Sequence, residues 1–136
     1  MKPVSGDGLL AEFPVWPAAR AGDYFRVRVF RTVKAMRADH AAFAKELRYR
    51  GPRAGWLGLT VRWDRRRGNR ERGIVWLPRI RGLSLILAHE MVHVAFTIPG
   101  VPPQQTTDAE ERFCHAVSVL VAQCQAALWR EGIRSV

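Results

Sequence analysis

The sequence predicts an α+β fold, in which a short antiparallel sheet packs on an N-terminal helix and two C-terminal helices. Three observations lead to this prediction. The chain has 136 residues, which is enough for one domain with a hydrophobic core. Three short segments have the apolar pattern of strands, and three longer segments have helical period. Their order, β-α-β-β-α-α, contains no internal repeat and no regular βαβ unit, which favours a small α+β domain.

The segment 1–23 precedes the predicted domain at residues 24–136. It is rich in proline, glycine and alanine, and its apolar anchors are Leu9-Leu10 and Phe13–Pro17. We expect an extended arm that lies on the domain. The first six residues contain no apolar stretch of the kind found in secretory signals, which predicts a cytoplasmic protein.

The first strand and the first helix are predicted in the segment 24–50. From Tyr24 to Thr32, apolar residues alternate with arginines, which indicates a half-buried strand. From Val33 to Arg50 the apolar residues recur at helical spacing, and Gly51-Pro52 ends the helix. His40 lies in the apolar stripe of this helix, so we expect a histidine in the core or at its boundary rather than a metal ligand.

Two apolar segments, Trp56–Asp64 and Gly73–Leu77, predict a β-hairpin whose turn contains Gly68-Asn69. The hairpin tip is strongly basic, and the whole chain carries a net charge of +10. A basic surface of this kind can bind nucleic acid or an acidic protein partner, whereas a solvated hairpin end needs no partner. The candidate contacts are the five arginines of the tip: Arg65, Arg66, Arg67, Arg70 and Arg72.

The next helical segment contains the motif HExxH, formed by His89, Glu90 and His93 in an apolar run. Residues i and i+4 share a helix face one turn apart, so both imidazoles can bind one Zn²⁺, and Glu90 can take a proton from a water molecule there. Ser84 is the expected N-cap, and Pro99-Gly100 ends the helix. A core helix with two chance histidines is the alternative. A membrane span is disfavoured because three polar side chains would lie at its centre.

The segment Asp108–Arg130 predicts a last helix with one apolar face, and Gly132 ends it. The two cysteines of the chain, Cys114 and Cys124, both fall in this helix. Helical geometry separates them by about 15 Å, which is too far for a disulfide bond. We therefore expect reduced, partly buried thiols, as in cytosolic proteins.

A catalytic zinc site needs a third protein ligand and an open position for water. Helical phase places Glu110 on the apolar face of the last helix, and Glu111 and His115 on its flank. A capping box from Asp108 to Glu111 would also leave Glu110 free for the metal. A box from Thr107 to Glu110 would instead leave Glu111 as the ligand. His115 is a third ligand, a group that stabilises an oxyanion, or a surface residue.

Three segments carry a resemblance to a known family: Gly73–Leu77, Leu85–His93 and Asp108–His115. Together they resemble the compact gluzincin-like metallopeptidases, in particular the ImmA/IrrE type and small HExxH proteins encoded by phages and prophages. The resemblance covers about residues 25–130 and implies a small zincin-like domain. It implies that His89 and His93 bind zinc together with Glu110 or Glu111, and that Glu90 is the general base.

The sequence also departs from these families. After Glu110, Glu-Arg-Phe stands where the ImmA/IrrE type usually has Glu-Ala-Asn. We expect the signalling extensions of that type to be missing. The SprT-like group is a second similar family, but its later His-Gly ligand segment is missing here. The departures from the ImmA/IrrE type bear on regulation more than on the zinc site, whereas the missing ligand segment makes the SprT-like group the less similar of the two.

The predicted function is that of a zinc-dependent metallopeptidase, which hydrolyses a peptide bond of a protein or peptide substrate with Glu90 as the base. The strand Ile74–Leu77 is expected to pair with an extended substrate by strand addition. The alternative is a binding module without catalysis, in which the zinc is structural and the basic face contacts nucleic acid or an acidic protein. We expect no membrane partner.

Overall fold

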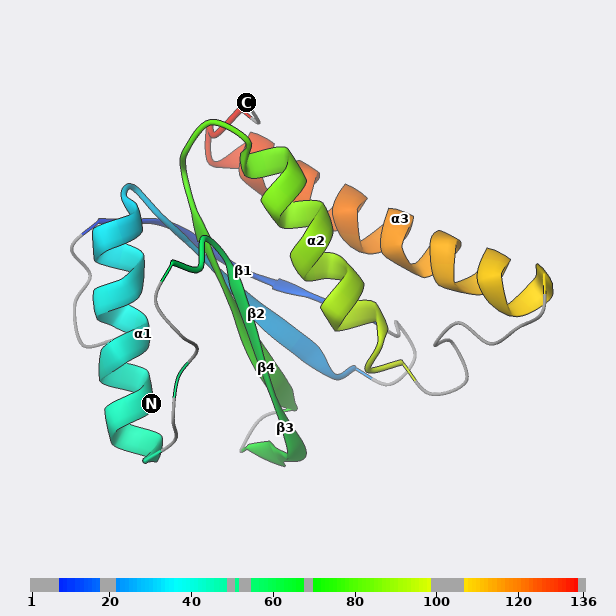
Figure 1. The fold of residues 1–136 in the computed structure, drawn as a ribbon. Helices are drawn as coiled ribbons and strands as arrows, with labels where there is room; N and C mark the ends of the chain where they lie inside the picture. The colour runs from blue at the N-terminus through cyan, green and yellow to red at the C-terminus, as the bar shows by residue number, and fades with distance from the viewer. Residues whose placement is uncertain are drawn as a thin grey trace.

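A four-stranded sheet lies between one helix on one face and two helices on the other (Figure 1). The computed structural model describes residues 8–17, 22–48, 51, 55–67, 70–98 and 107–134, with only the backbone at 64–67 and 107. The elements in chain order are β1 (Leu9–Val15), β2 (Tyr24–Phe30), α1 (Val33–Leu47), β3 (Leu59–Arg67), β4 (Glu71–Pro78), α2 (Leu83–Ala95) and α3 (Thr107–Arg130). The predicted α+β class is confirmed, and the order has one strand more than predicted.

The sheet has the strand order β1-β2-β4-β3 and is mixed, which corrects the prediction of a purely antiparallel sheet. β1 with β2 and β3 with β4 are antiparallel pairs, whereas the two central strands, β2 and β4, are parallel. A parallel pair needs a long connection between its strands. Here the connection consists of α1, the segment that follows it and β3. It returns the chain to the starting end of β2, so that β4 runs in the same direction as β2.

The structure corrects the prediction of an extended arm at residues 1–23, because Leu9–Val15 forms the edge strand β1. Ala11, Phe13 and Val15 are buried, and the residues between them are exposed. Pro14 lies within this strand and Pro17 follows it, and proline is disfavoured in a central strand. An edge strand tolerates proline because one of its sides needs no backbone donor.

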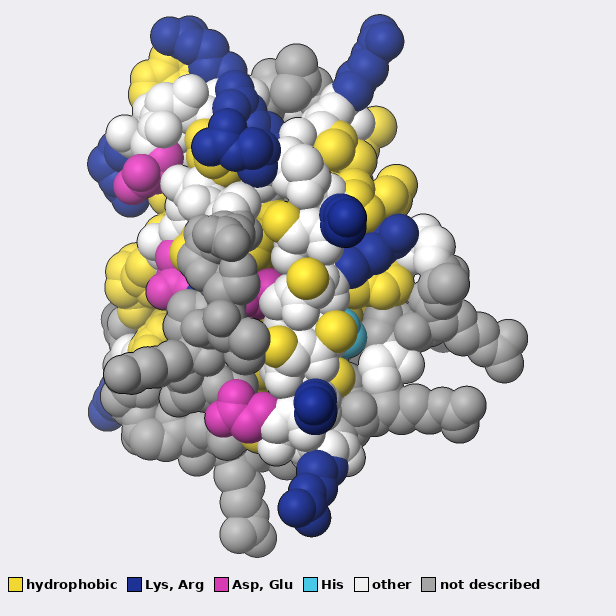
Figure 2. Space-filling model, turned by 90° about the vertical axis from the view of Figure 1, so that its left-hand side faces the viewer, with side chains coloured by type: hydrophobic (Ala, Val, Ile, Leu, Met, Phe, Trp, Pro, Cys, Tyr) yellow, Lys and Arg dark blue, Asp and Glu magenta, His cyan; other side chains and the backbone are white. Residues whose placement is uncertain are grey.

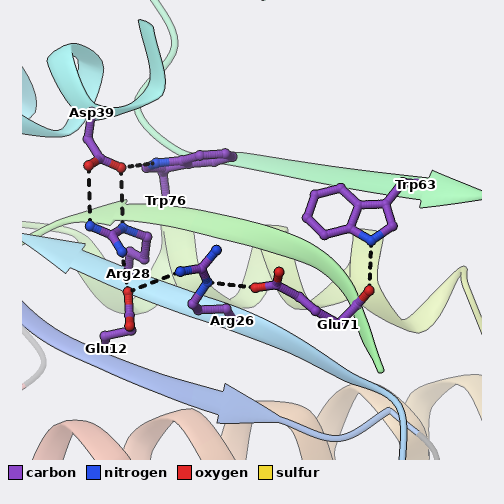
Figure 3. Close-up of polar contacts among 7 residues, drawn as sticks. All are labelled: Glu12, Arg26, Arg28, Asp39, Trp63, Glu71 and Trp76. Atoms are coloured by element: carbon purple, nitrogen blue, oxygen red, sulfur yellow. Dashed lines mark hydrogen bonds and ion pairs between the residues drawn. The ribbon is translucent and has the colours of Figure 1, made fainter. Parts of the chain in front are cut away.

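The face of the sheet under α1 holds a polar network (Figure 3). The carboxylate of Asp39 on α1 accepts hydrogen bonds from Arg28 Nη2 at 3.2 Å and from Trp76 Nε1 at 2.9 Å. Glu12 on β1 forms a second ion pair with Arg28, which is only 2% exposed. β2 is therefore buried on both faces rather than half-buried. The buried charge of Arg28 at the centre of β2 is tolerated because the carboxylates of Asp39 and Glu12 are paired with it.

α1 follows the predicted stripe and ends earlier than predicted. Thr32 caps its start by accepting a hydrogen bond from the backbone of Ala35, and Arg48 ends it in the left-handed conformation at φ 54°. Met36, His40 and Phe43 are buried against the sheet, as the helical period predicts. His40 packs edge-on against Trp76, with ring centroids 5.0 Å apart, which confirms its place in the core.

α2 and α3 cover the opposite face of the sheet and pack against each other. α2 begins after Gly82, which corrects the prediction of Ser84 as N-cap, and it ends at Ala95. α3 begins at Thr107, and Gly132 follows it with φ 73°, as predicted for a helix end. No helix in the described ranges is long and apolar enough to cross a membrane.

The two cysteines of α3 are both free, as predicted. Cys114 is exposed, whereas Cys124 is buried beside Met91, with 3.5 Å between the two sulfur atoms. Burial raises the pKa of the Cys124 thiol to about 12. Cys124 therefore serves as a small apolar residue at the contact between α2 and α3.

Candidate metal centre

α2 presents the two motif histidines on one exposed face, as the i, i+4 spacing predicts. Nε2 of His89 and Nε2 of His93 lie 3.3 Å apart, and their ring centroids are 5.0 Å apart. Zn–N bonds of about 2.0–2.1 Å at a tetrahedral angle would place two ligand nitrogens about 3.3 Å apart. The histidine pair therefore fits one zinc ion, although a hydrogen bond between the rings satisfies the same distance.

Glu90 follows His89 on the helix, lines the same hollow and is only 4% exposed. Its Oε1 accepts a hydrogen bond of 2.8 Å from the hydroxyl of Thr60 on β3. The same hydroxyl lies 3.4 Å from the main-chain oxygen of Glu90. A buried carboxylate is costly unless it is hydrogen-bonded, so Thr60 fixes the position of Glu90. The other oxygen, Oε2, has no hydrogen bond to the described residues.

Gly58, just before β3, leaves room for the Glu90 carboxylate. A Cβ atom at this position would lie 3.1 Å from Glu90 Oε2 and 2.6 Å from Cγ2 of Ile86. A side chain at Gly58 would therefore push on both the helix and the carboxylate. The absence of a Cβ allows β3 to approach α2 closely at the motif.

Thr60 and Gly58 are the site residues that the sequence analysis missed. Thr60 lies on the polar side of β3. Its partner in β4, Val75, lies on the same face of the sheet, which is the face that α2 and α3 cover. Leu59, Val61 and Trp63 pack on the α1 side instead. The alternation of polar and apolar residues in β3 was the signal that could have identified Thr60. When the polar side of a strand faces a helix that carries HExxH, its residues are expected to belong to the site rather than to a solvated surface.

Two hollows lie against α2, one beside the segment just before β3 and one beside β3, and we call them together the groove. Its first part is a cavity of about 420 Å³, lined by Trp56, Leu57, Gly58, Leu85, Ile86, His89 and Glu90. Its second part is a hollow of about 350 Å³, lined by Thr60, Arg62, His93 and Phe96. The groove is therefore apolar before the histidines and bears one exposed cation, Arg62, beyond them.

The wall of the groove at Trp56 is held by α1. Arg37 donates a hydrogen bond of 2.6 Å from Nη2 to the main-chain oxygen of Trp56, and its guanidinium lies 5.8 Å from the indole centroid. His40 contacts the same indole edge-on, with centroids 5.1 Å apart. Burial lowers the pKa of His40, and Asp39 partly offsets this effect.

The structure corrects the prediction that Ile74–Leu77 pairs with a substrate. That segment lies in β4, which is hydrogen-bonded to β2 on one side and to β3 on the other. The strand beside the groove is β3, and it is an edge strand. Within the described ranges no strand pairs with its outer side, so β3 and not β4 can accept an added strand.

The predicted third ligands do not join the histidine pair. Glu110, Glu111 and His115 are all exposed on α3, and the described part of the chain contains no group of three or more His, Cys, Asp and Glu side chains that could hold a metal ion. Glu110 lies one turn before Phe113, whose ring contacts Phe96 of α2 with centroids 5.1 Å apart, but the buried residue of the first turn of α3 is Ala109.

The basic hairpin tip lies largely outside the described side chains, including those of Arg65, Arg66 and Arg67. Arg70 is exposed and adopts a left-handed backbone conformation with φ 65°. Arg72 forms an ion pair with Asp23, with 3.7 Å between Nη1 and Oδ2. Arg72 is thus partly neutralised within the domain.

Comparison of the chain with protein-family models, curated proteins and solved structures gives no match.

Proposed function

We propose that the protein is a zinc-dependent peptidase, with its active site in the groove between β3 and α2. The observation that carries the proposal is the convergence of His89 Nε2 and His93 Nε2 at 3.3 Å beside a buried carboxylate, Glu90. HExxH on a helix is the pattern of two zinc ligands and a general base. The free edge of β3, which borders the same groove, supports a peptide as the substrate.

His89 and His93 would hold the zinc, and Glu110 is the third ligand that we favour. Its position one turn before Phe113, whose ring contacts Phe96 of α2, supports this choice over Glu111 and His115. Bound zinc supplies Lewis acidity, which makes water a stronger acid and a carbonyl carbon more electrophilic.

Glu90 performs the proton transfers of the proposed reaction. Because Thr60 occupies Oε1, Oε2 is the oxygen that takes a proton from the attacking water. The same oxygen then gives the proton to the leaving amine, so that water and a peptide yield a carboxylate and an amine. Thr60 is a positioning residue, since it holds the carboxylate at the groove.

The substrate chain would lie along β3 in an extended conformation. Backbone hydrogen bonds to the outer edge of β3 would align it, and the cavity beside Trp56 and Leu85 would take a side chain. Leu85 is 78% exposed, so a substrate side chain would cover apolar surface that water otherwise contacts.

The test combines metal content with peptide hydrolysis. The protein, Glu90→Gln, Glu110→Gln, Glu111→Gln and His115→Gln are each reconstituted with zinc, and bound zinc and cleavage of a mixed peptide library are measured. We expect one zinc per chain in the unmutated protein and in Glu90→Gln, with hydrolysis lost in Glu90→Gln. We expect zinc to be lost in Glu110→Gln alone among the α3 variants. An unmutated protein without zinc, or an active Glu90→Gln, would refute the proposal.

A further inference from the structure

A row of cations crosses the end of the molecule at which β2 and β4 end and α1 and α2 begin. It consists of Arg31, Lys34, Arg79 and Arg81. Arg31 and Arg79 directly follow the adjacent parallel strands, and the backbone N–H of Arg79 donates to Phe30 O at 2.7 Å. Figure 2 shows Lys and Arg side chains gathered at the upper end of the α1 side, where acidic side chains are few.

The four cations are not neutralised by the described part of the protein. Each of Arg31, Lys34, Arg79 and Arg81 is exposed, and none of them forms an ion pair within the described ranges. Among the described side chains of the sheet, by contrast, three arginines are paired with carboxylates: Arg26, Arg28 and Arg72. The four cations of the row therefore differ from the arginines that stabilise the fold through ion pairs.

The starts of α1 and α2 carry or adjoin cations, where helices usually favour acidic side chains. The first turn of a helix favours acidic side chains, because the helix dipole is positive there. α3 follows this rule with Asp108 and Glu110. α1 and α2 have no acidic residue in the first turn, and α1 carries Lys34 there. A bound anion would be attracted both by the cations and by the two helix starts, which gives this placement a physical reason.

The arrangement fits a chain of phosphates better than a single anion. α1 and α2 lie on opposite faces of the sheet, so Lys34 and Arg81 extend the row to either side of Arg31 and Arg79. Ile80, between the two arginines of the β4–α2 connection, is half-buried, so this connection exposes its two arginines rather than an apolar side chain. The end of α3 adds Arg130 and Arg134 at the same end, with Glu131 between them (Figure 1).

We propose that the row Arg31–Lys34–Arg79–Arg81 binds the phosphate backbone of a nucleic acid. The row shares no residue with the lining of the groove: Arg81 precedes α2, and the first motif histidine, His89, lies eight residues further on, which corresponds to about 12 Å at the rise of an α-helix. It is also separate from the hairpin tip, since β4 begins at the tip and ends at the row. Binding there does not require zinc.

The test is binding of fluorescein-labelled, mixed-sequence oligonucleotides, single-stranded and duplex, followed by anisotropy at several salt concentrations. Lys34→Glu/Arg79→Glu is compared with Lys45→Glu/Arg112→Glu, which makes the same change of net charge at exposed positions outside the row. We expect the first pair to weaken binding by about tenfold or more and the second by far less. The neutral pair Lys34→Gln/Arg79→Gln should reduce the slope of log K against log salt by about 2.

Three results would overturn the proposal. The first is no binding by the unmutated protein at low salt. The second is an equal loss in the two charge-reversed pairs, which would mean that only net charge matters. The third is row-dependent binding to anionic phospholipid vesicles without binding to oligonucleotides. Circular dichroism checks that the variants are folded, and a chelator should leave oligonucleotide binding unchanged, which separates this result from the proposed peptidase.

Discussion

Replacement of Thr60 by valine tests the contact that positions Glu90. Valine has the shape of threonine and suits a strand equally well, so the change removes little besides the hydroxyl. It breaks the 2.8 Å hydrogen bond to a carboxylate that is 4% exposed. Hydrogen bonds to charged groups contribute about 1.5–3 kcal/mol, and Glu90 Oε1 would be left buried without its donor.

We therefore expect Thr60→Val to lower the free energy of unfolding by about 1.5–3 kcal/mol. With a urea dependence of about 1–3 kcal/mol per molar, the unfolding midpoint should fall by on the order of 1 M. Urea titrations followed by circular dichroism measure this shift. Thr60→Ser keeps the hydroxyl and is the matched control, with a smaller loss expected.

A double-mutant cycle with Glu90→Met separates the contact from other effects of the substitution. If Thr60 acts through Glu90, Thr60→Val should cost little once the carboxylate is gone. A cost of 1.5 kcal/mol or more in that background would show that the hydroxyl acts elsewhere. A cost below about 0.5 kcal/mol in the unmutated background would mean that Thr60 does not hold Glu90.

Three further predictions concern the rest of the domain. Asp39→Ala removes a buried partner of Arg28 and should lower the free energy of unfolding by about 3 kcal/mol in urea titrations; a loss under 1 kcal/mol would contradict a structural role for the pair. Burial lowers the pKa of His40 below its ordinary value of 6.5, so the unfolded chain binds a proton more readily. Unfolding midpoints should therefore fall as the pH drops from 7.5 through 6.5 to 5.5, and they should fall less in His40→Gln. If the unmutated protein and His40→Gln had identical pH profiles, His40 would not be the source of the pH dependence. Iodoacetamide at pH 8 should modify exposed Cys114 but not Cys124 in the folded protein, as mass spectrometry of peptides can show; equal rates would mean that Cys124 is accessible.

The motif helix was predictable because its signals are local. The spacing of His89 and His93 determines that both rings share a face, and the structure places them 3.3 Å apart. The apolar period likewise predicted α1 and α3 to within a few residues. The start of α2 was less predictable, because Gly82 takes the cap position without a side chain that forms a cap hydrogen bond.

The contacts that complete the site depend on tertiary structure and were not predictable. Thr60 and Glu90 are thirty residues apart and meet only because β3 is the edge strand beside α2. The parallel pairing of β2 with β4 decides which strand occupies that edge. Sequence alternation identifies strands, but it does not give their order in the sheet. The substrate strand was therefore assigned to β4 instead of β3.

The edge position of β1 shows a second limit. Pro14 and Pro17 are strong signals against a central strand, but they are compatible with an edge, and the alternation of Ala11, Phe13 and Val15 was available beside them. For the third metal ligand, helical phase distinguishes Glu110 from Glu111 but gives no distance to the histidines. That ligand remains a prediction.

The unpaired side of β3 also bears on how the protein behaves at high concentration. An open strand edge can pair with the same edge of another molecule, and sheets grow into aggregates in this way. β3 carries four arginines among its nine residues, and two such strands brought edge to edge would repel each other. A short substrate without this charge would meet no such barrier. Salt screens repulsion of this kind, so the same arginines should protect the protein from self-association less well as ionic strength rises.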